Sequence, residues 1–564
     1  MSVILGISNT HNGSVALIHE GEVKVAVQAE RISRKKRQAL PLGEERELTN
    51  SCVRYCLNSS GFRYQDIDAV AFSTPYPTKE IKDTELTRYI GGQPKKNPKI
   101  FYVPHHLAHM EYIVHYGESK PGIVLVVDGS GSLEADRSTF NIKEEHHSEI
   151  INHSHFAGKE VISAYWFNGL KSSLIYRFSP SLAAIDHCNS HAGQFLQSIG
   201  HYWVWASYYC FGTGQEAGKV MGLAAFGDAE KSDRPKNLSL NDKCELRLDF
   251  HGIHTRYRSP NVLGLDLSDS KHHQDLARKV QDETELAILK LLSILKEKFP
   301  AENLYLSGGV ALNVVANERI RTSGLFSNLV LNGSVEDNGT AIGAALAASI
   351  ELGCERKYSP ITDYYGTEYS EDDILEAVTQ YDFSYEVFSE EEMHSCAAEL
   401  IRQEHVLGWF QGRSEFGPRA LGNRSIFANP SSYASKYILD SFMKCRDRYR
   451  PYAPVVIEER APQYFDIDDS SPVMMRNVRV LDKRLVAITH IDGTARVQTV
   501  RKQDNQRLYQ LLVEVERSTG FPILLNTSFN RPGEPIVETP LDALKSFSIG
   551  TLDRLVLGNV LISR

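Results

Sequence analysis

Apolar and polar residues alternate along the first 28 residues in the way that paired β-strands require. Apolar runs cover residues 3–7, 14–18 and 23–27, and a polar loop and a Glu-Gly turn separate them. This spacing predicts a hairpin-like set of strands at the start of the chain.

Strand-like and helix-like patterns then follow one another as far as residue 352. We predict strands at residues 69–72, 122–128, 304–307 and 329–332, and helices at 45–60, from Pro104 onward, 281–298, 310–321 and 340–352. Polar, glycine-rich loops stand at several of the strand ends. This order predicts an α/β fold, in which ligands bind beyond the carboxyl ends of the strands.

A mixed polar stretch between Gly353 and Asp372 interrupts the pattern and contains Pro360. We therefore predict two domains, 1–355 and 356–564, the second being a further α/β or α+β unit. The 564 residues alone allow two to four domains. No internal repeat and no low-complexity segment is evident in the sequence.

Composition and charge narrow the functional classes. Hydrophobic residues make up 42% and charged residues 24%, which is ordinary for a globular protein, and no apolar run is long enough to span a membrane. The net charge of −9 gives no support to nucleic-acid or membrane binding. The first residues resemble a strand and not a signal peptide. Eight scattered cysteines without a C-x-x-C motif indicate free thiols, as in a reducing cytoplasm.

The segment 104–109 carries the first candidate chemistry, because it contains three histidines. His105 and His109 are four residues apart, so both imidazoles project from one face of a helix and can bind one metal. His106 and His109 offer a second pairing, and histidines without a metal are an equally ordinary explanation. Asp128 ends a strand and Asp337 precedes a helix, so each can add a carboxylate. Two imidazoles and two carboxylates suit Fe, Mn or Zn.

Glycine-rich loops carry the second candidate chemistry. Residues 128–132 and 307–313 each follow a strand, where glycine lets backbone N–H groups approach a phosphate. Residues 212–222 are similar, although their Gly-Lys pair lacks the spacing of a Walker A loop. Each loop alone is typical of a plain turn, but three in one α/β region favour a nucleotide.

Basic and polar loops gather in the second domain. They cover residues 412–424, 444–454, 492–498 and 525–534. Residues 401–450 contain nine Lys or Arg against four Asp or Glu, a local sum of +5 within an acidic chain. Such groups suit a small phosphate-bearing anion, and solvated salt bridges are the alternative.

Two weaker features remain near the N-terminus. His11 lies in the loop after the first strand, where its ordinary pKa would allow catalysis of proton transfer. The basic run 31–37 is typical of a solvated turn, with a phosphate contact as the alternative. Further on, residues 201–209 are rich in aromatics, and we expect them to form core in preference to a ligand-binding wall.

Taken together, these residues resemble the NodU/CmcH family of O-carbamoyltransferases, especially its antibiotic-tailoring members. The Glu415–Ser425 string is the most specific match. The other matching stretches are the opening strand with His11, 30–35, 105–109, 128–129, 218–224, 307–313, 336–339, 450–454 and 526–530.

The resemblance implies both fold and reaction. It implies an N-terminal domain like the Kae/TsaD proteins, with the actin/Hsp70/sugar-kinase fold, and a C-terminal YrdC-like α/β domain. In this family the C-terminal domain takes carbamoyl phosphate and releases phosphate. The carbamate passes to the N-terminal domain and reacts with ATP to give carbamoyl adenylate and pyrophosphate. A hydroxyl of a small molecule, such as an antibiotic or its sugar, then attacks and releases AMP.

The resemblance also implies a role for each site residue. The metal, iron with Mn, Zn or Mg as alternatives, would bind His105, His109, Asp128 and Asp337. The nucleotide would contact Gly129, Ser130, Gly131, Lys219, Gly308, Gly309 and Asn313. Carbamoyl phosphate would bind Lys444, Arg450, Arg496, Ser528 and Asn530. His11 matches the histidine of the final transfer, as a base or as a group that orients the acceptor. The alternatives are a threonylcarbamoylation enzyme acting on tRNA, a non-enzymatic ATP-binding module and a sugar kinase.

Overall fold

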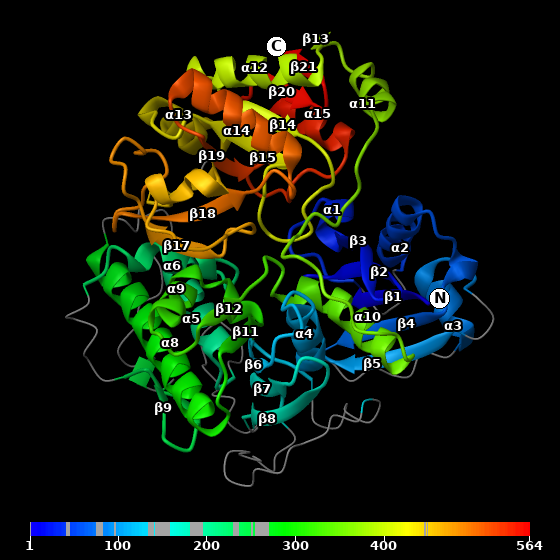
Figure 1. Ribbon diagram of the computed structural model, residues 1–564, viewed down its shortest axis with the longest axis vertical. Coiled ribbons are helices and arrows are strands. Elements are labelled where there is room, and N and C mark those ends of the chain that lie inside the picture. Colours follow the sequence, from blue (N-terminus) through cyan, green and yellow to red (C-terminus); the bar gives the residue numbers. More distant parts are fainter. Residues whose placement is uncertain are drawn as a thin grey trace. The chain divides into compact units, whose positions relative to one another are not determined.

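The chain of the computed structural model divides into two units (Figure 1). Unit 1 comprises Met1–Lys24 and Ala39–Pro360, and unit 2 comprises Val25–Gln38 and Ile361–Arg564. The structure describes residues 2–40, 46–74, 83–94, 98–132, 140, 158–180, 196–228, 236–249, 252–253, 270–444, 447 and 449–564.

Two five-stranded sheets form the frame of unit 1. The first has the order β3-β2-β1-β4-β5, with bounds β1 (Val3–Ser8), β2 (Ser14–His19), β3 (Glu22–Gln28), β4 (Ala69–Thr74) and β5 (Lys99–Pro104). The second has the order β12-β11-β6-β7-β8, with bounds β6 (Gly122–Val127), β7 (Ile162–Phe167), β8 (Ser172–Phe178), β11 (Asn303–Ser307) and β12 (Asn328–Val330).

The two sheets repeat one topology. We count the strands of each sheet in chain order. The first strand, β1 or β6, pairs antiparallel with the second and parallel with the fourth, and the fifth is parallel to the fourth. The sequence predicted no repeat, but the structure contains one at the level of strand order. The reason is that topology requires only a suitable pattern of buried positions, which very different side chains can supply. This duplication confirms the α/β class and the actin/Hsp70/sugar-kinase fold expected for the N-terminal domain.

Two helices lie between these sheets. Helix α10 (Thr340–Glu351) packs on β1, β2 and β4, whereas α4 (His105–Val114) packs on β6 and β11, and the two helices pack on each other (Figure 1). The alanine-rich sequence of α10 allows this close approach. A Cβ on Gly343 would lie 1.8 Å from the carbonyl oxygen of Ala108. The site residues at the start of both helices therefore depend on this contact.

The remaining elements of unit 1 surround these layers. Helix α8 begins ten residues before the predicted start at Gln281, because its first turns also bury apolar positions such as Leu276 and Val280. The aromatic helix α5 is buried, as expected for core. The bounds are α2 (Glu47–Ser60), η1 (Tyr64–Asp66), α3 (Asp83–Ile90), α5 (Ile199–Phe211), α6 (Ala217–Ala224), β9 (Leu238–Leu240), β10 (Leu246–Leu248), α8 (Lys271–Lys298), η6 (Gly309–Leu312), α9 (Val314–Thr322) and η7 (Asp337–Gly339).

Unit 2 is built on one nine-stranded mixed sheet, in the order β13-β21-β20-β14-β15-β19-β16-β18-β17. One apolar core includes side chains of α12 and α14, and a second includes those of α11 and α15. The bounds are α11 (Glu371–Val378), β13 (Ser384–Val387), α12 (Glu390–Arg402), β14 (Leu407–Phe410), β15 (Arg424–Ala428), α13 (Tyr433–Ile438), η8 (Leu439–Met443), β16 (Ala453–Ile457), η9 (Glu458–Gln463), β17 (Arg476–Arg479), β18 (Thr494–Val500), α14 (Gln506–Thr519), β19 (Ile523–Ser528), α15 (Pro540–Ile549), β20 (Arg554–Leu557) and β21 (Val560–Ser563).

Unit 2 also contains a segment from the start of the chain, Val25–Gln38, which includes α1 (Ala29–Ser33). Arg31 is buried and donates a hydrogen bond of 2.8 Å to the carbonyl of Gly417. Arg34 donates to the carbonyls of Pro535 and Ile536 at 2.9 and 2.8 Å. The expectation of a solvated turn is therefore wrong for these two arginines, because their guanidinium groups satisfy backbone carbonyls of unit 2.

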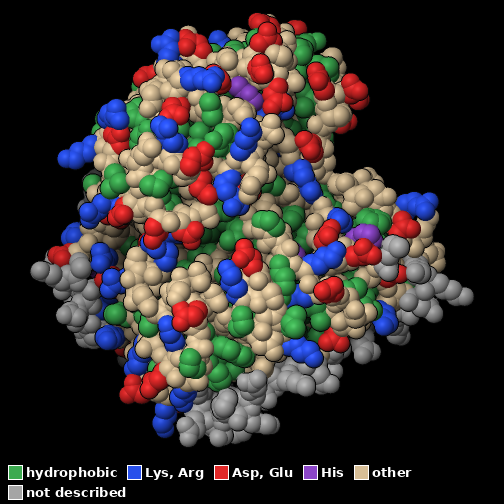
Figure 2. All heavy atoms as spheres, viewed as in Figure 1, with side chains coloured by type: hydrophobic (Ala, Val, Ile, Leu, Met, Phe, Trp, Pro, Cys, Tyr) green, Lys and Arg blue, Asp and Glu red, His purple; other side chains and the backbone are tan. Residues whose placement is uncertain are grey.

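The surface agrees with the modest net charge. Figure 2 shows Lys and Arg side chains interspersed with Asp and Glu over the visible face. Among the helices that the structure describes, none has the length and apolarity needed to cross a membrane. The six cysteines within the described ranges are free thiols, while Cys188 and Cys445 lie outside those ranges.

Candidate metal, nucleotide and anion sites

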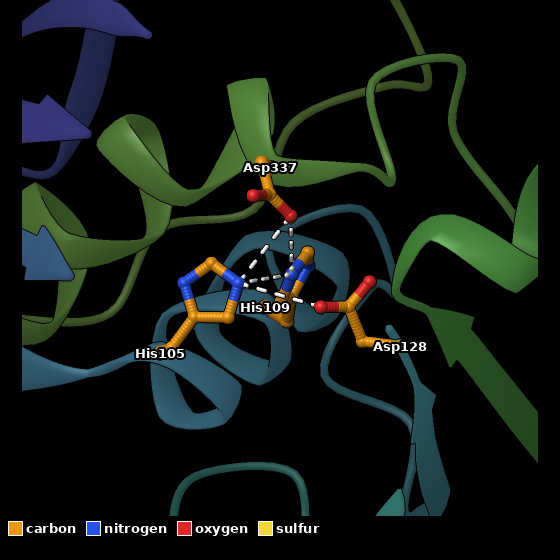
Figure 3. Close-up of side chains that lie close together, drawn as sticks. All are labelled: His105, His109, Asp128 and Asp337. Carbon is orange, nitrogen blue, oxygen red and sulfur yellow. Dashed lines mark hydrogen bonds and ion pairs between the residues drawn. The ribbon is translucent and has the colours of Figure 1, made fainter. Parts of the chain in front are cut away.

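Four buried side chains meet in unit 1 where the two halves of the duplicated fold come together (Figure 3). His105 and His109 occupy the first turns of α4, directly after β5, and Pro104 begins that helix with an extended conformation. Asp128 follows β6, and Asp337 begins η7 just before α10. Residues that follow three separate strands, β5, β6 and β12, thus bring their polar groups to one point, as α/β folds do at strand ends.

The geometry of this His105/His109/Asp128/Asp337 cluster is compact. One ligand atom from each residue lies within 4.8 Å of the others. The two Nε2 atoms are 3.2 Å apart. His105 Nε2 lies 3.6 Å from a carboxylate oxygen of Asp128 and 3.3 Å from one of Asp337, and His109 Nε2 lies 3.7 Å from Asp337.

Electrostatics favour a cation in the cluster. Burial by itself lowers the pKa of His105, but the carboxylates of Asp337 and Asp128 outweigh it and raise that pKa to about 9. Burial raises the pKa of both aspartates, yet the imidazoles hold the pKa of each carboxyl below its usual value. Two ionised carboxylates are therefore buried beside two imidazole nitrogens that face one another. This donor set fits a divalent metal.

Two serines that the sequence analysis did not assign orient the imidazoles. Ser73 Oγ lies 3.3 Å from His105 Nδ1, and Ser307 Oγ lies 3.3 Å from His109 Nδ1. Metal-binding histidines commonly use the second ring nitrogen in this way. The signal available in the sequence was that each serine stands at the carboxyl end of a predicted strand.

The choice between the two histidine pairs is resolved by His106. Its Nδ1 atom lies 2.8 Å from Ser163 Oγ and 3.8 Å from a carboxylate oxygen of Glu160. His106 thus contacts Ser163 and Glu160, and His105 joins His109 in the cluster.

His11 lies beside the cluster and reaches solvent. Its Nδ1 atom is 3.3 Å from a carboxylate oxygen of Asp337, and 66% of its side chain is exposed. Loss of water on the side of the ring that faces the protein lowers the pKa of His11, but the carboxylate of Asp337 outweighs this effect and raises that pKa to about 9.

The glycine loops meet at Asp128. The backbone N–H of Gly309 donates to Asp128 Oδ1 at 2.9 Å. Gly308 has a φ of +94°, and a Cβ there would lie 2.3 Å from the Val127 carbonyl oxygen. A Cβ on Gly131 would lie 2.6 Å from the ring of His106. Gly308 and Gly131 are therefore required for the local course of the backbone, and the Gly309 N–H brings residues 308–309 to Asp128.

Asn313 and Lys219, two other residues predicted to contact the nucleotide, interact with neighbouring protein residues. The Asn313 side chain accepts the N–H of Ala316 at 3.0 Å, capping α9, and exchanges hydrogen bonds with Gln281. Lys219, on α6, pairs with Glu216 at 3.4 Å and lies over the ring of Phe211. Both are thus held in place by neighbours of their own.

In unit 2, three of the predicted anion-binding residues come together. The Lys444 ammonium donates to the carbonyl and hydroxyl oxygens of Ser528, and to the carbonyl and side-chain oxygens of Asn530 at 3.0 and 2.8 Å. Ser528 Oγ donates to Asn530 Oδ1 at 2.6 Å. Lys444 directly follows the π-helix η8, a local distortion often found at functional sites.

Arg450 and Arg496 belong to the same end of the sheet. Arg450 lies three residues before β16, which pairs antiparallel with β19 so that Ala453 is opposite Asn526. β18 is parallel to β16, and Arg496 lies near its start. The starts of β16 and β18 therefore lie beside the end of β19, where Ser528 stands.

The Gly/Arg-rich loop 412–424 is organised from within. Glu415, which is buried, accepts backbone N–H groups of Leu421, Asn423 and Arg424 on one carboxylate oxygen, at 2.7, 2.8 and 3.2 Å. The fully buried guanidinium of Arg424 lies over the ring of Phe410 at 3.6 Å from its centroid. It also donates to the carbonyl oxygens of Gln411, Gly412, Asn423, Thr367 and Glu538. The positive charge of Arg424 therefore stabilises the conformation of loop 412–424.

Comparison with known proteins places this architecture in a family. The family model described as carbamoyltransferase N-terminus matches residues 3–346, and that described as carbamoyltransferase C-terminus matches residues 398–564. The chain belongs to the carbamoyltransferase family. This confirms the resemblance to the NodU/CmcH O-carbamoyltransferases and supports a transferase.

Two relatives illustrate the family. Nodulation protein NolNO of Sinorhizobium fredii is 31% identical, and the match covers 99% of this chain and 80% of the relative. The 3'-hydroxymethylcephem-O-carbamoyltransferase of Streptomyces clavuligerus is 30% identical, over 61% of this chain and 64% of the relative. Among solved structures, HypF of T. kodakarensis aligns with a TM-score of 0.40 at 14% identity, covering 62% of this chain and 48% of that chain.

Proposed function

We propose that this carbamoyltransferase uses carbamoyl phosphate and ATP to carbamoylate a hydroxyl group of a small natural product. The observation that carries the proposal is the buried His105/His109/Asp128/Asp337 cluster, with two glycine loops converging on Asp128. A cation site lined by backbone N–H groups suits a nucleotide triphosphate. The relative named for a cephem O-carbamoyl transfer supports a small hydroxylated acceptor.

The reaction balances in three steps. Water cleaves carbamoyl phosphate in unit 2 and gives carbamate and inorganic phosphate. In unit 1 a carbamate oxygen attacks the α-phosphorus of ATP, which forms carbamoyl adenylate and releases pyrophosphate. The acceptor hydroxyl then attacks the carbamoyl carbon, loses its proton and expels AMP. Adenylation is needed because carbamate is a poor electrophile and AMP is a good leaving group.

Unit 1 supplies charge and backbone donors to the nucleotide. Iron, or Mn, Zn or Mg in its place, would be held by the four-residue cluster and would offset the charge of the phosphates. Gly129, Ser130 and Gly131 form one wall of the site, and Gly308 and Gly309 form the other. We assign Lys219 and Asn313 to the nucleotide site as well, with Asn313 acting through the α9 cap that it already makes.

Unit 2 supplies the anion site. Lys444, Ser528 and Asn530 form its hydrogen-bonded centre, and the guanidinium groups of Arg450 and Arg496 add positive charge from neighbouring strands. The ammonium of Lys444 now bonds to oxygens of its neighbours, and a phosphate would compete for the same hydrogens.

His11 is assigned to the final transfer. The attacking alcohol must lose a proton, and a partly exposed imidazole beside the cluster can take it or hold the hydroxyl in position. Because the charge of Asp337 raises the pKa of His11, compensation of that charge returns the imidazole towards its neutral, basic form.

The decisive assay supplies carbamoyl phosphate, ATP and a divalent metal and measures AMP, ADP and pyrophosphate. No acceptor is present in this assay, so water hydrolyses the carbamoyl adenylate in its place. We expect AMP and pyrophosphate in equal amounts, both dependent on carbamoyl phosphate. ADP as the product would instead identify a kinase. His105→Ala should abolish AMP formation, whereas His115→Ala, which alters a buried histidine at the far end of α4, should keep it. Full activity of His105→Ala would overturn the metal assignment.

A further inference from the structure

Two rows of polar side chains lie on one face of the unit 2 sheet. On β19, Asn526 and Ser528 are two residues apart and share a face, and on β18 the same holds for Arg496 and Gln498. Strand β16 lies between these two strands. Ser528 and Arg496 are the members of these rows that belong to the proposed anion site. We call the two amides further into the sheet, Asn526 and Gln498, the inner row; by strand register Asn526 lies level with Arg496, and Gln498 lies one step deeper.

The inner row is buried and its orientation is fixed. The Asn526 Nδ2 atom donates to the carbonyl of Ala420 at 3.1 Å and to Gln498 Oε1 at 3.2 Å. Gln498 Nε2 in turn donates to the carbonyl of Leu421 at 2.7 Å. Because both partners of Asn526 Nδ2 are acceptors, the amide group cannot be flipped without losing both bonds.

This leaves one acceptor without a donor. Asn526 is only 2% exposed, and its Oδ1 atom has no hydrogen-bond partner within the described parts of the chain. Buried acceptors are nearly always paired, and an unpaired one is costly. The oxygen therefore calls for an N–H donor from a ligand.

The spacing tells which ligand atom would supply that donor. Residues two apart on a strand are separated by about 6.6 Å. A small acyl phosphate whose phosphoryl group binds Ser528 and Lys444 therefore extends its acyl end towards Asn526. In carbamoyl phosphate that end carries an NH2 group with two hydrogens to donate, whereas other acyl phosphates, such as acetyl phosphate, have a methyl group there.

We infer that Asn526 is the specificity-determining residue for the carbamoyl amino group, with Oδ1 accepting one of its hydrogens. The inference rests on the proposed function, since it assumes that carbamoyl phosphate binds in unit 2. Gln498 is a positioning residue, because it bonds the Asn526 amide and anchors it to the loop carbonyl of Leu421.

The test compares carbamoyl phosphate with acetyl phosphate, in which a methyl group replaces NH2. Phosphate release by the full chain is measured with each substrate after subtraction of the enzyme-free rate. A site that hydrogen-bonds a substrate N–H rejects the analogue lacking it by about 10⁴-fold. We expect the wild type to show a preference of this order, and Asn526→Ala to reduce the preference at least tenfold.

The matched control is Thr527→Ala, the next residue on β19, whose side chain points to the opposite face. It should leave the preference unchanged. If Asn526→Ala does not fold, Asn526→Ser keeps a small polar side chain that is too short to reach the amino group, and the same loss is expected. Inhibition by inorganic phosphate should be equal in wild type and variant, which shows that the anion site is intact.

Two outcomes are separable. A folded Asn526 variant that keeps the wild-type preference would overturn this inference and leave the proposed function standing. A wild type that releases no phosphate from carbamoyl phosphate, with ATP and metal present, would overturn the proposed function itself.

Discussion

Substituting Gly343 by alanine should open the metal cluster without altering any of its four residues. Gly343 is on α10, two turns after Asp337, and faces Ala108 on α4, the helix that carries His105 and His109. A Cβ would lie 1.8 Å from the Ala108 carbonyl oxygen, where a carbon-to-oxygen contact needs about 3.3 Å. The two helices must therefore separate by about 1.5 Å at this point.

That displacement is large compared with what a metal site tolerates. Ligand distances in such sites vary by about 0.2 Å, so even a fraction of the shift removes Asp337 from its partners. We expect metal affinity to fall by at least tenfold, which is the size of effect seen when groups supporting a metal site are changed. Overpacking of two buried helices should also cost about 1–3 kcal/mol in the free energy of unfolding.

The assay is metal titration by calorimetry, together with urea unfolding of the metal-free protein. Gly218→Ala is the matched control, because Gly218 lies in a helix with open space around its Cβ position. That change should stabilise the protein by up to about 1 kcal/mol and leave metal binding unchanged. Wild-type metal affinity and stability in Gly343→Ala would refute the reasoning that this helix contact sets the spacing of the ligands.

Three further predictions test other parts of the structure. In chelator-treated protein, the raised pKa of His105 stabilises the folded state fully below pH 6.5, and this stabilisation is lost as the pH rises through about 9. The urea midpoint of the wild type should therefore fall between pH 6 and pH 9.5. In His105→Gln the difference between these two midpoints should be smaller. Arg424→Lys should lower the free energy of unfolding by roughly 3 kcal/mol, because an ammonium has fewer hydrogens than a guanidinium and cannot bond all five carbonyl groups. The exposed Arg402→Lys should change it by under about 0.5 kcal/mol. Lys444→Met should reduce phosphate release from carbamoyl phosphate by about 10²-fold or more, and Lys545→Met on the surface of α15 should not; equal rates in the two would remove Lys444 from the anion site.

The order of elements could be predicted from the chain because most of them carry their own pattern. Strand β6 is a continuous apolar run that Asp128 follows directly, and Pro104 marks the start of α4. The duplication of the two sheets could not be predicted, because the residue pattern of a strand does not show which distant strand it pairs with. Strands β6 and β11 are an example. The extra turns at the start of α8 were missed because charged residues there dilute the apolar period.

The site divides in the same way. Helical spacing placed His105 and His109 on one face, but only the fold shows that His106 bonds Ser163 instead. Local sequence could not separate arginines that bind ligands from arginines that hold loops. Arg424 is the clearest case, because its role depends on carbonyl groups from segments more than 100 residues away as well as nearby ones.

The segment Val25–Gln38 has a consequence for how the protein is made. Arg31 leaves the ribosome 386 residues ahead of Gly417, and Arg34 leaves 502 residues ahead of Ile536, yet these pairs hydrogen-bond within unit 2. Unit 2 can therefore be completed only when synthesis is nearly finished. Until then Val25–Gln38 lacks the carbonyl groups to which it hydrogen-bonds in the folded protein. If the gene were divided after residue 360, Val25–Gln38 would be part of the N-terminal fragment, although it belongs to unit 2. Independent folding of a C-terminal fragment is thus not to be expected from the position of the cut alone.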